Sequence, residues 1–243
     1  MVKANLIGVV LLMEVILRFG VDGLSMQYYM MSCPFADLII KNTVNNALQA
    51  DPTLAAALVR MHFHDCFIEG CDGSVLIDST KDNTAEKDSP ANLSLREMLF
   101  SGQGVHYEIA KGRKDGRRSK IEDTINLPFP TFNASELIRQ FGQRGLTAQD
   151  MVALSGAHTL GVSRCASFKS RLSNVDPTLD SDFAKTLSKT CSAGDNAEQP
   201  FDATRNTFDN FYFYALQRKS GVLFSDQTLY KVQELETLLT TMP

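Results

Sequence analysis

Apolar residues recur at helical spacing along much of the chain. Between residues 36 and 49 they lie three or four positions apart, until Asp51 and Pro52 interrupt the pattern. A second apolar run begins at Thr53. The pattern therefore predicts a helix over residues 36–49 and another that starts at Thr53.

Two later helices are marked by their first residues. Asn133 is followed three positions later by Glu136, and Thr147 by Asp150. At this spacing the cap side chain and the acid each satisfy a free amide of the other. Gly145 ends the first of these two helices.

The remaining pattern also favours helix over strand. The aromatic-rich stretch 206–219, stopped by Gly221, predicts one more helix. Residues 97–111 contain glycine and show no sustained period, so a loop or a weak two-stranded turn is expected there. No alternating strand series, internal repeat or low-complexity linker stands out. We predict one mostly α-helical domain.

Composition agrees with one folded domain that buries a core. The chain has 243 residues, of which 44% are hydrophobic and 21% charged. Its 24 basic and 28 acidic residues give a net charge of −4, which offers no basic footprint for nucleic acid. It has no tryptophan, which excludes any mechanism that stores an oxidising equivalent on an indole.

The first 25 residues have the pattern of a secretory signal peptide, followed by one domain over residues 26–243. Glu14 and Arg18 interrupt the apolar run, which leaves an uncleaved leader as the alternative. The run falls short of the roughly 20 apolar residues that a membrane-spanning helix needs. Export would place the cysteines where disulfides persist.

The densest group of reactive side chains lies in the helix expected after Thr53. Arg60 and His64 are four residues apart and share one helix face, whereas His62 points away from both. The guanidinium disfavours protonation of the imidazole, which suits a general base, and it can stabilise developing negative charge. The alternative is a helix end with a core histidine and a solvated arginine.

Residues 65–74 form an oxygen-rich loop of carboxylates, a hydroxyl and glycines, the ligand type that calcium takes. Zinc is the competing metal, through His62, His64, Cys66 and Cys71. It would require thiolates in a reducing compartment, and the spacing matches no usual zinc finger.

A second histidine, His158, lies near the end of the helix that starts at Thr147. Gly156 and Gly161 are expected to leave a shallow surface beside it for a flat ligand, although His158 taken alone suits a buried structural role. The acid and hydroxyl groups of residues 202–209 and 225–227 are weak signals, because such clusters are usually solvated caps.

Together these motifs resemble the class III family of secreted plant haem peroxidases. Residues 58–67 look like the family's distal signature and residues 152–159 like its proximal signature. Supporting matches are residues 29–34, 86–88 with Asn92, 112–115, 126–128, 208–210 and 225–227. The resemblance runs from about Tyr28 to Tyr230 and implies a helical domain around haem b.

The resemblance assigns roles on both faces of the haem. It implies that His158 is the axial ligand of the iron and that Asp226 accepts the other ring hydrogen of that histidine. His64 would move the proton of hydrogen peroxide while Arg60 stabilises charge. Asn92 would fix the tautomer of His64, so its glycosylation triplet is expected to stay unused. The triplet at Asn133 is a second candidate.

The other implied sites concern cofactor contact, donors and calcium. Phe63 would contact the cofactor, and phenolic donors would give up single electrons near Pro128. The distal calcium would take Asp65, Ile68, Gly70, Asp72, Ser74 and Glu86, and the proximal calcium Thr159, Asp202, Thr204, Thr207 and Asp209. The expected protein is a secreted monomer of the extracellular space, cell wall or vacuole. It would act in hydrogen peroxide catabolism and the response to oxidative stress, without nucleic-acid or membrane partners.

The sequence also departs from the family. After Arg96 a helical stretch with a Cys-Ala-Asp motif is absent near residues 97–104, and the chain stops at Pro243 before the family's last helices. Each large side chain that loses its packing partner forfeits roughly 1.5–3 kcal/mol. We therefore expect poor folding or weak haem binding. The alternative to an active peroxidase is a non-catalytic shortened isoform, or an incomplete gene model, that binds calcium and retains haem poorly.

The five cysteines fit the same interpretation. The resemblance implies two disulfides, Cys66 with Cys71 and Cys165 with Cys191. The usual partner of Cys33 falls in the missing stretch, so Cys33 is predicted to be a free thiol.

Overall fold

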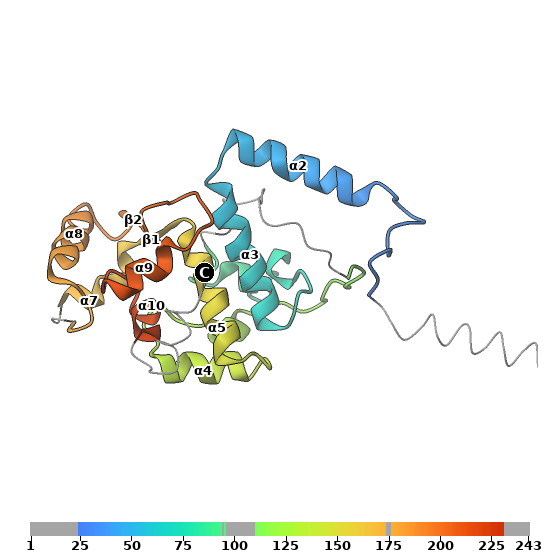
Figure 1. The fold of residues 1–243 in the computed structure, drawn as a ribbon. Helices are drawn as coiled ribbons and strands as arrows, with labels where there is room; N and C mark the ends of the chain where they lie inside the picture. The colour runs from blue at the N-terminus through green and yellow to red at the C-terminus, as the bar shows by residue number, and fades with distance from the viewer. Residues whose placement is uncertain (1–23, 94, 96–109, 174–175, 231–243) are drawn as a thin grey trace, which may run out of the picture.

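The computed structural model describes residues 24–93, 95, 110–173 and 176–230 and shows a mainly helical protein (Figure 1). The all-α prediction is confirmed, with a small antiparallel sheet added. The α-helices are α2 (Ala36–Ala50), α3 (Leu54–Ile68), α4 (Ala134–Gly142), α5 (Ala148–Ser155), α6 (Cys165–Phe168), α7 (Ser170–Ser173), α8 (Ser181–Cys191), α9 (Phe211–Gln217) and α10 (Phe224–Leu229). Short 3-10 turns are η1 (Ser74–Leu76), η2 (Glu86–Asp88), η4 (Ile121–Asn126) and η5 (Gly156–Thr159), and the strands are β1 (Val162–Arg164) and β2 (Glu198–Pro200).

The largest core lies where α3, α4, α5, α9 and α10 meet. Its buried members include Phe67, Phe141, Met151, Tyr212 and Leu229. The capping boxes expected at the starts of α4 and α5 are both present, so these helices begin where the sequence predicts. This core holds the helices that carry the two histidine motifs in fixed positions.

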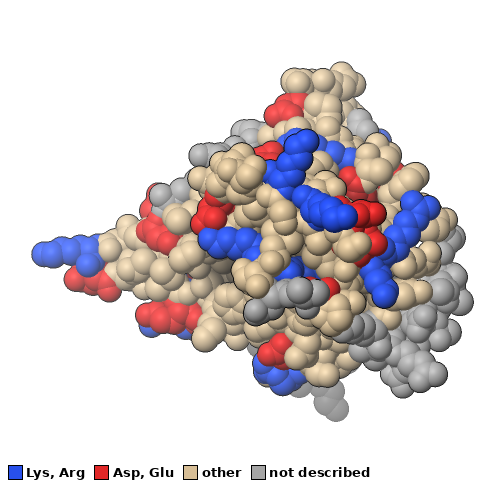
Figure 2. Space-filling view, turned by 90° about the vertical axis from the view of Figure 1, so that its left-hand side faces the viewer, with Lys and Arg blue, Asp and Glu red and all other residues tan. Residues whose placement is uncertain are grey.

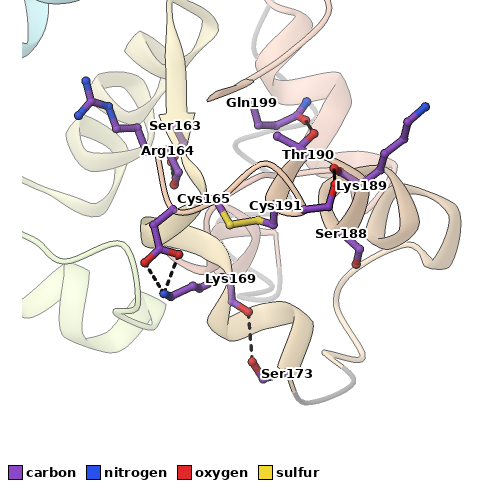
Figure 3. Close-up of a disulfide and its surroundings, with 12 residues drawn as sticks. Ser163, Arg164, Cys165, Lys169, Ser173, Ser188, Lys189, Thr190, Cys191 and Gln199 are labelled. Carbon is purple, nitrogen blue, oxygen red and sulfur yellow. Dashed lines mark hydrogen bonds and ion pairs between the residues drawn. A yellow bond between two sulfur atoms is a disulfide. The ribbon is translucent and has the colours of Figure 1, made fainter. Parts of the chain in front are cut away.

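A second core joins the C-terminal elements. Phe168, Leu187 and Val222 pack together with the Cys165–Cys191 disulfide, which links α6 to α8 (Figure 3). Lys169, beside this disulfide, pairs with Asp195 at 2.7 Å. The disulfide expected here, and the one between Cys66 and Cys71, are both confirmed.

Helix α2 lies at one edge of the molecule and meets α3 through a small apolar cluster (Figure 1). Leu48, Ala55 and Leu160 form that cluster. Leu38 and Ile39 on the same helix are more than half exposed, at 54% and 56%. The apolar pattern of α2 is therefore only partly covered by the described residues.

Several sequence predictions about helices, strands and loops need correction or fall outside the described residues. The helix expected over residues 206–219 begins only at Phe211, because Asp209 accepts the Phe211 amide at 2.9 Å and residues before it form turns. Strands β1 and β2 pair antiparallel, with Val162 opposite Pro200, and were not anticipated. Of the loop expected over residues 97–111, positions 97–109 lie outside the described residues, and only positions 110 and 111 are described.

The N-terminal prediction is only partly within the described structure. The signal-peptide segment lies outside it up to residue 23, while Ser25 forms a two-way backbone bridge with Lys111, both hydrogen bonds at 2.8 Å. Within the described residues no helix is long and apolar enough to cross a membrane. Figure 2 shows Lys and Arg side chains lying among Asp and Glu side chains on one face, in keeping with the small net charge.

Candidate active site

Helix α3 carries the first histidine, His64, and Asn92 fixes its tautomer. The Nδ1 of His64 lies 2.6 Å from Asn92 Oδ1, while the Asn92 amide nitrogen donates to the Glu86 carbonyl at 2.8 Å. The oxygen of the Asn92 side chain must therefore face His64 and accept a hydrogen from Nδ1. This leaves Nε2 of His64 as a free lone pair, the form that a general base requires.

Burial and charge keep His64 neutral. Burial first, and the positive charge of Arg60 second, lower the pKa of His64 from 6.5 to about 4, against a smaller opposing effect of the Asn92 hydrogen bond. The helical spacing of Arg60 and His64 predicted this relation, and the structure shows it. A neutral imidazole with a free Nε2 persists across the physiological pH range.

The turn that contains Asn92 also binds Arg60. Its guanidinium donates to the Ala91 carbonyl at 2.7 Å. Burial and the charge of Arg164 lower its pKa, which remains that of a permanent cation. The charge of Arg60 lowers the pKa of His64 and also opposes protonation of His158. One guanidinium is thus within electrostatic reach of both histidines.

The second histidine lies in η5, directly after α5. Its Nδ1 donates to Asp226 Oδ1 at 2.8 Å, and its ring stacks on Phe201 with centroids 4.4 Å apart and planes 6° from parallel. Burial lowers the pKa of His158, but the charge and hydrogen bond of Asp226 outweigh it, so the net shift is upward. Because Nδ1 is bonded to Asp226, Nε2 is the nitrogen of His158 that has no hydrogen bond among the described residues.

The glycines near His158 do not form the shallow surface that the sequence suggested. A Cβ on Gly156 would lie 2.9 Å from the Phe213 ring, and one on Gly161, whose φ is +89°, would lie 2.7 Å from the Ala56 side chain. Both glycines are buried and allow close packing of η5 and the loop after it. Their role is therefore to position His158.

The donor set suits haem, for which a histidine with an oriented Nδ1 is the ligand type. Two imidazoles have Nδ1 committed to Asn92 and Asp226 and leave Nε2 available. Phe63, expected to contact the cofactor, lies beside His64 with ring centroids 6.1 Å apart and packs on Phe67 at 4.7 Å. His62, by contrast, is exposed and contacts the Cys66 sulfur at 3.6 Å.

The predicted distal calcium residues converge around buried, unsatisfied oxygens. Asp65 Oδ1 and Glu86 Oε1 have no hydrogen-bond partner within the described part of the chain, and Ser74 donates to Glu86 Oε2 at 3.3 Å. Asp72 accepts the Ser74 amide at 3.1 Å, and the Asp72 amide binds the Gly70 carbonyl. Such oxygens fit a hard cation.

The negative charge of these clustered carboxylates also favours a bound cation. Burial, together with the charges of Asp72, Asp123 and Asp65, raises the pKa of Glu86 to about 7. A bound dication would offset the repulsion among these carboxylates and stabilise the ionised form of Glu86. Zinc fits poorly here: His62, Cys66 and Cys71 lie within 4.8 Å of one another, but the disulfide removes both thiolates. Ile68 has its side chain in the main core, which leaves only its carbonyl to offer.

The predicted proximal calcium residues also gather. Thr159 Oγ1 lies 2.6 Å from Asp202 Oδ2 and 3.1 Å from Asp209 Oδ1, and Thr204 binds Asp202 Oδ1 through both its amide and its hydroxyl. Thr207 is connected through its backbone, which donates to the Thr204 carbonyl at 2.8 Å. Two carboxylates on one hydroxyl form an oxygen set that suits calcium.

Sequence reasoning missed one buried group next to His158. The Tyr212 hydroxyl donates to Asp226 Oδ1 at 3.1 Å. The aromatic-rich helix was recognised, yet nothing in its spacing marks Tyr212 among its neighbours Phe211, Phe213 and Tyr214. Only the packing of α9 on α10 selects it.

Comparison with known proteins agrees with this geometry. The sequence model of a family described as "Peroxidase" matches residues 40–102 and 97–242. The chain therefore belongs to the peroxidase family. Its similar relatives place it among the class III plant peroxidases: it is 63% identical to Peroxidase 47 of Arabidopsis thaliana, over 98% of this chain and 84% of the relative. It is 40% identical to Arabidopsis Peroxidase 64, over 98% of this chain and 87% of the relative. It is 41% identical to Peroxidase 5 of Vitis vinifera, over 85% of this chain and 76% of the relative.

The comparisons also concern the length of the chain. The alignment with Peroxidase 47 spans 272 positions, more than the 243 residues of this chain, so it contains gaps on the side of this chain. The chain is therefore shorter than this relative over the aligned part. That the missing residues lie after Arg96 stays a prediction.

Proposed function

We propose that this peroxidase reduces hydrogen peroxide to two waters while two phenolic donors each lose one electron and one proton. The observation that carries the proposal is a pair of oriented histidines, His64 hydrogen-bonded to Asn92 and His158 hydrogen-bonded to Asp226, with Arg60 in electrostatic reach of both. A structural histidine needs neither a free Nε2 nor a neighbouring desolvated guanidinium.

His158 would hold haem b through Nε2, with Asp226 orienting the ring. Bound haem supplies the redox chemistry that takes two oxidising equivalents from peroxide. Nε2 of His64 accepts the proton of the incoming peroxide and passes it to the outer oxygen, which leaves as water. The guanidinium of Arg60 stabilises the negative charge on that oxygen as the O–O bond breaks.

The donor site is proposed at Pro128, which is half-buried and follows η4. The adjacent Phe129 ring is 45% exposed and lies 5.2 Å from the Phe132 ring, so an aromatic surface is available there for a phenol. A hollow of about 330 Å³ lies elsewhere, among α8, β2 and α9, and Pro128 does not line it.

Two calcium ions would complete the molecule, one at each carboxylate cluster. We further propose that the protein is a secreted monomer in the cell wall, extracellular space or vacuole. There it would contribute to hydrogen peroxide catabolism and the oxidative-stress response. The buried Asn92, engaged with both His64 and Glu86, supports the expectation that its triplet carries no glycan. The two disulfides support export.

One observation favours the alternative, a non-catalytic isoform that binds calcium and retains haem poorly. The apolar side chains Phe35, Leu38, Ile39 and Ile40 of α2 and its start are 54–66% exposed among the described residues. Their exposure reduces the packing that stabilises α3, the helix that carries Arg60 and His64.

Guaiacol oxidation in the presence of excess haemin and calcium tests the proposal. His64→Ala is expected to lower peroxide-dependent turnover about 10²- to 10⁴-fold, the usual contribution of a general acid–base group. His62→Ala is the matched control, because His62 lies on the same helix but is exposed. Wild-type turnover no greater than that of free haemin would favour the alternative isoform.

A further inference from the structure

The carboxylate behind His158 has two hydrogen-bond donors on one oxygen. Asp226 Oδ1 accepts from His158 Nδ1 at 2.8 Å and from the Tyr212 hydroxyl at 3.1 Å. Asp226 is only 2% exposed, and its second oxygen, Oδ2, has no hydrogen-bond partner within the described ranges. The two donors therefore share the charge of a single, poorly solvated carboxylate.

Tyr212 cannot turn away from this position. Its side chain is 1% exposed and belongs to the main core, and its ring meets the His158 ring edge-on, with centroids 6.1 Å apart. The helices that carry Tyr212 and Asp226 are fastened by Gln227, which donates to the Leu216 carbonyl at 2.9 Å and accepts the Gly221 amide at 3.0 Å. The distance between the phenol and the carboxylate is thus set by packing.

The phenol acts only as a donor. A carboxylate oxygen can only accept, so the hydrogen between the two groups is that of the Tyr212 hydroxyl. A carboxylate that accepts one hydrogen bond is a weaker acceptor for a second, because part of its charge is already neutralised.

We infer that Tyr212 is a positioning residue of the peroxidase site: its hydroxyl holds Asp226 against His158 and limits how strongly that carboxylate pulls on the His158 Nδ1 hydrogen. This inference rests on the proposed function for its consequence at the haem. A stronger pull makes the imidazole more electron-donating and stabilises ferric over ferrous iron. Tyr212 therefore sets an upper limit to the donor strength of His158.

The first test is the ferric/ferrous reduction potential of the haem-loaded protein. Tyr212→Phe removes only the hydroxyl and is expected to shift the potential to a more negative value. Tyr214→Phe is the matched control, since Tyr214 lies on the same helix, is 45% exposed and makes no hydrogen bond to Asp226. The control is expected to leave the potential unchanged.

The second test uses the haem-free protein and does not depend on turnover. Tyr212→Phe is expected to favour unfolding about tenfold, because a hydrogen bond to a buried charge is lost. In an Asp226→Ala background the same substitution has no charge to leave unpaired, so stability should stay unchanged or rise.

The inference is overturned if Tyr212→Phe leaves the potential unchanged, or shifts it no further than Tyr214→Phe does. It is also overturned if Tyr212→Phe destabilises the haem-free protein equally with and without Asp226, since the hydroxyl would then act only through packing. Failure of the proposed function appears separately, as wild-type protein without haem-dependent peroxide turnover.

Discussion

The neutrality and tautomer of His64 come from different neighbours. Burial and Arg60 keep the ring neutral, and Arg60 could be recognised from its place one helical turn before His64. Asn92, 28 residues away, fixes the tautomer. No periodicity connects such distant residues, so only the family motif marked Asn92 in the sequence, and Tyr212 was marked by nothing.

The acid limb of activity should report the pKa of His64. Turnover is expected to hold above pH 4 and fall as the pH drops through about 4, where His64 becomes protonated and cannot accept a proton. Arg60→Gln removes a positive charge and should move this limb to higher pH, besides lowering the rate. The pH dependence of guaiacol oxidation measures both. Arg113→Gln, an exposed change, is the control, and an identical limb in Arg60→Gln would contradict the assignment.

The lowered pKa of His64 also makes the free energy of unfolding depend on pH. Because the folded-state pKa of His64 is depressed from 6.5 to about 4, the unfolded chain binds more protons between these values. The free energy of unfolding should therefore decrease as the pH falls from 6.5 to 4, by up to about 3 kcal/mol. Denaturant titrations of wild type and His64→Leu across this range isolate the effect. A variant with the same pH slope as wild type would refute it.

At the scale of elements, the sequence was most reliable where local chemistry decides. The capping boxes of α4 and α5 predicted the starts of both helices, because cap and acid lie within one turn. Helix α9 begins later than expected because Asp209 accepts the Phe211 amide, and the same Asp209 oxygen also accepts the hydroxyl of Thr159, 50 residues away, which no local pattern reveals. Strands β1 and β2 have three residues each, too few to show a period.

The loop proposed to bind the distal calcium depends on contact with a distant segment. The Gly116 amide donates to the Asp72 carbonyl, and a Cβ on Gly116 would lie 2.1 Å from Asp72 Oδ2. Gly116→Ala should therefore displace the Asp72 carboxylate and weaken calcium binding. Gly142→Ala is the control, because a Cβ there meets nothing within 4 Å.

Thermal unfolding in calcium and in EGTA checks this prediction. Wild type and Gly142→Ala should lose a similar amount of Tm when calcium is chelated, whereas Gly116→Ala should lose less because it has less calcium-derived stability to lose. Equal EGTA effects in all three proteins would show that Asp72 does not hold calcium.

At the scale of the whole molecule, α2 packs on the rest of the described structure through only a small part of its apolar surface. It meets α3 through a small cluster and leaves Leu38, Ile39 and Ile40 exposed in the described structure, and Cys33 just before it is an exposed free thiol (Figure 1). The free thiol of Cys33 was predicted from the sequence, because the resemblance implies that the usual partner of Cys33 falls in the stretch expected to be missing.

The cysteine pairing predicts one free thiol per chain. Thiol titration of protein that is unfolded but not reduced should find Cys33 alone, with the other four cysteines in disulfides. The Cys33→Ser variant should give none. A value of zero for wild type would contradict the pairing.

The exposed face of α2 should also weaken haem retention, since α3 carries the residues proposed to face the haem. Haemin should saturate this protein at a higher concentration than Arabidopsis Peroxidase 47 titrated under the same conditions. Equal or tighter binding would show that α2 needs no further packing.

The most direct test of the haem site is a haemin titration of the full chain with calcium, followed by Soret absorbance. We expect a saturable band with one haem per chain in wild type and its loss in His158→Ala, while His62→Ala, changed at an exposed histidine, behaves as wild type. A band that never saturates in wild type, or one that His158→Ala retains unchanged, would contradict this expectation.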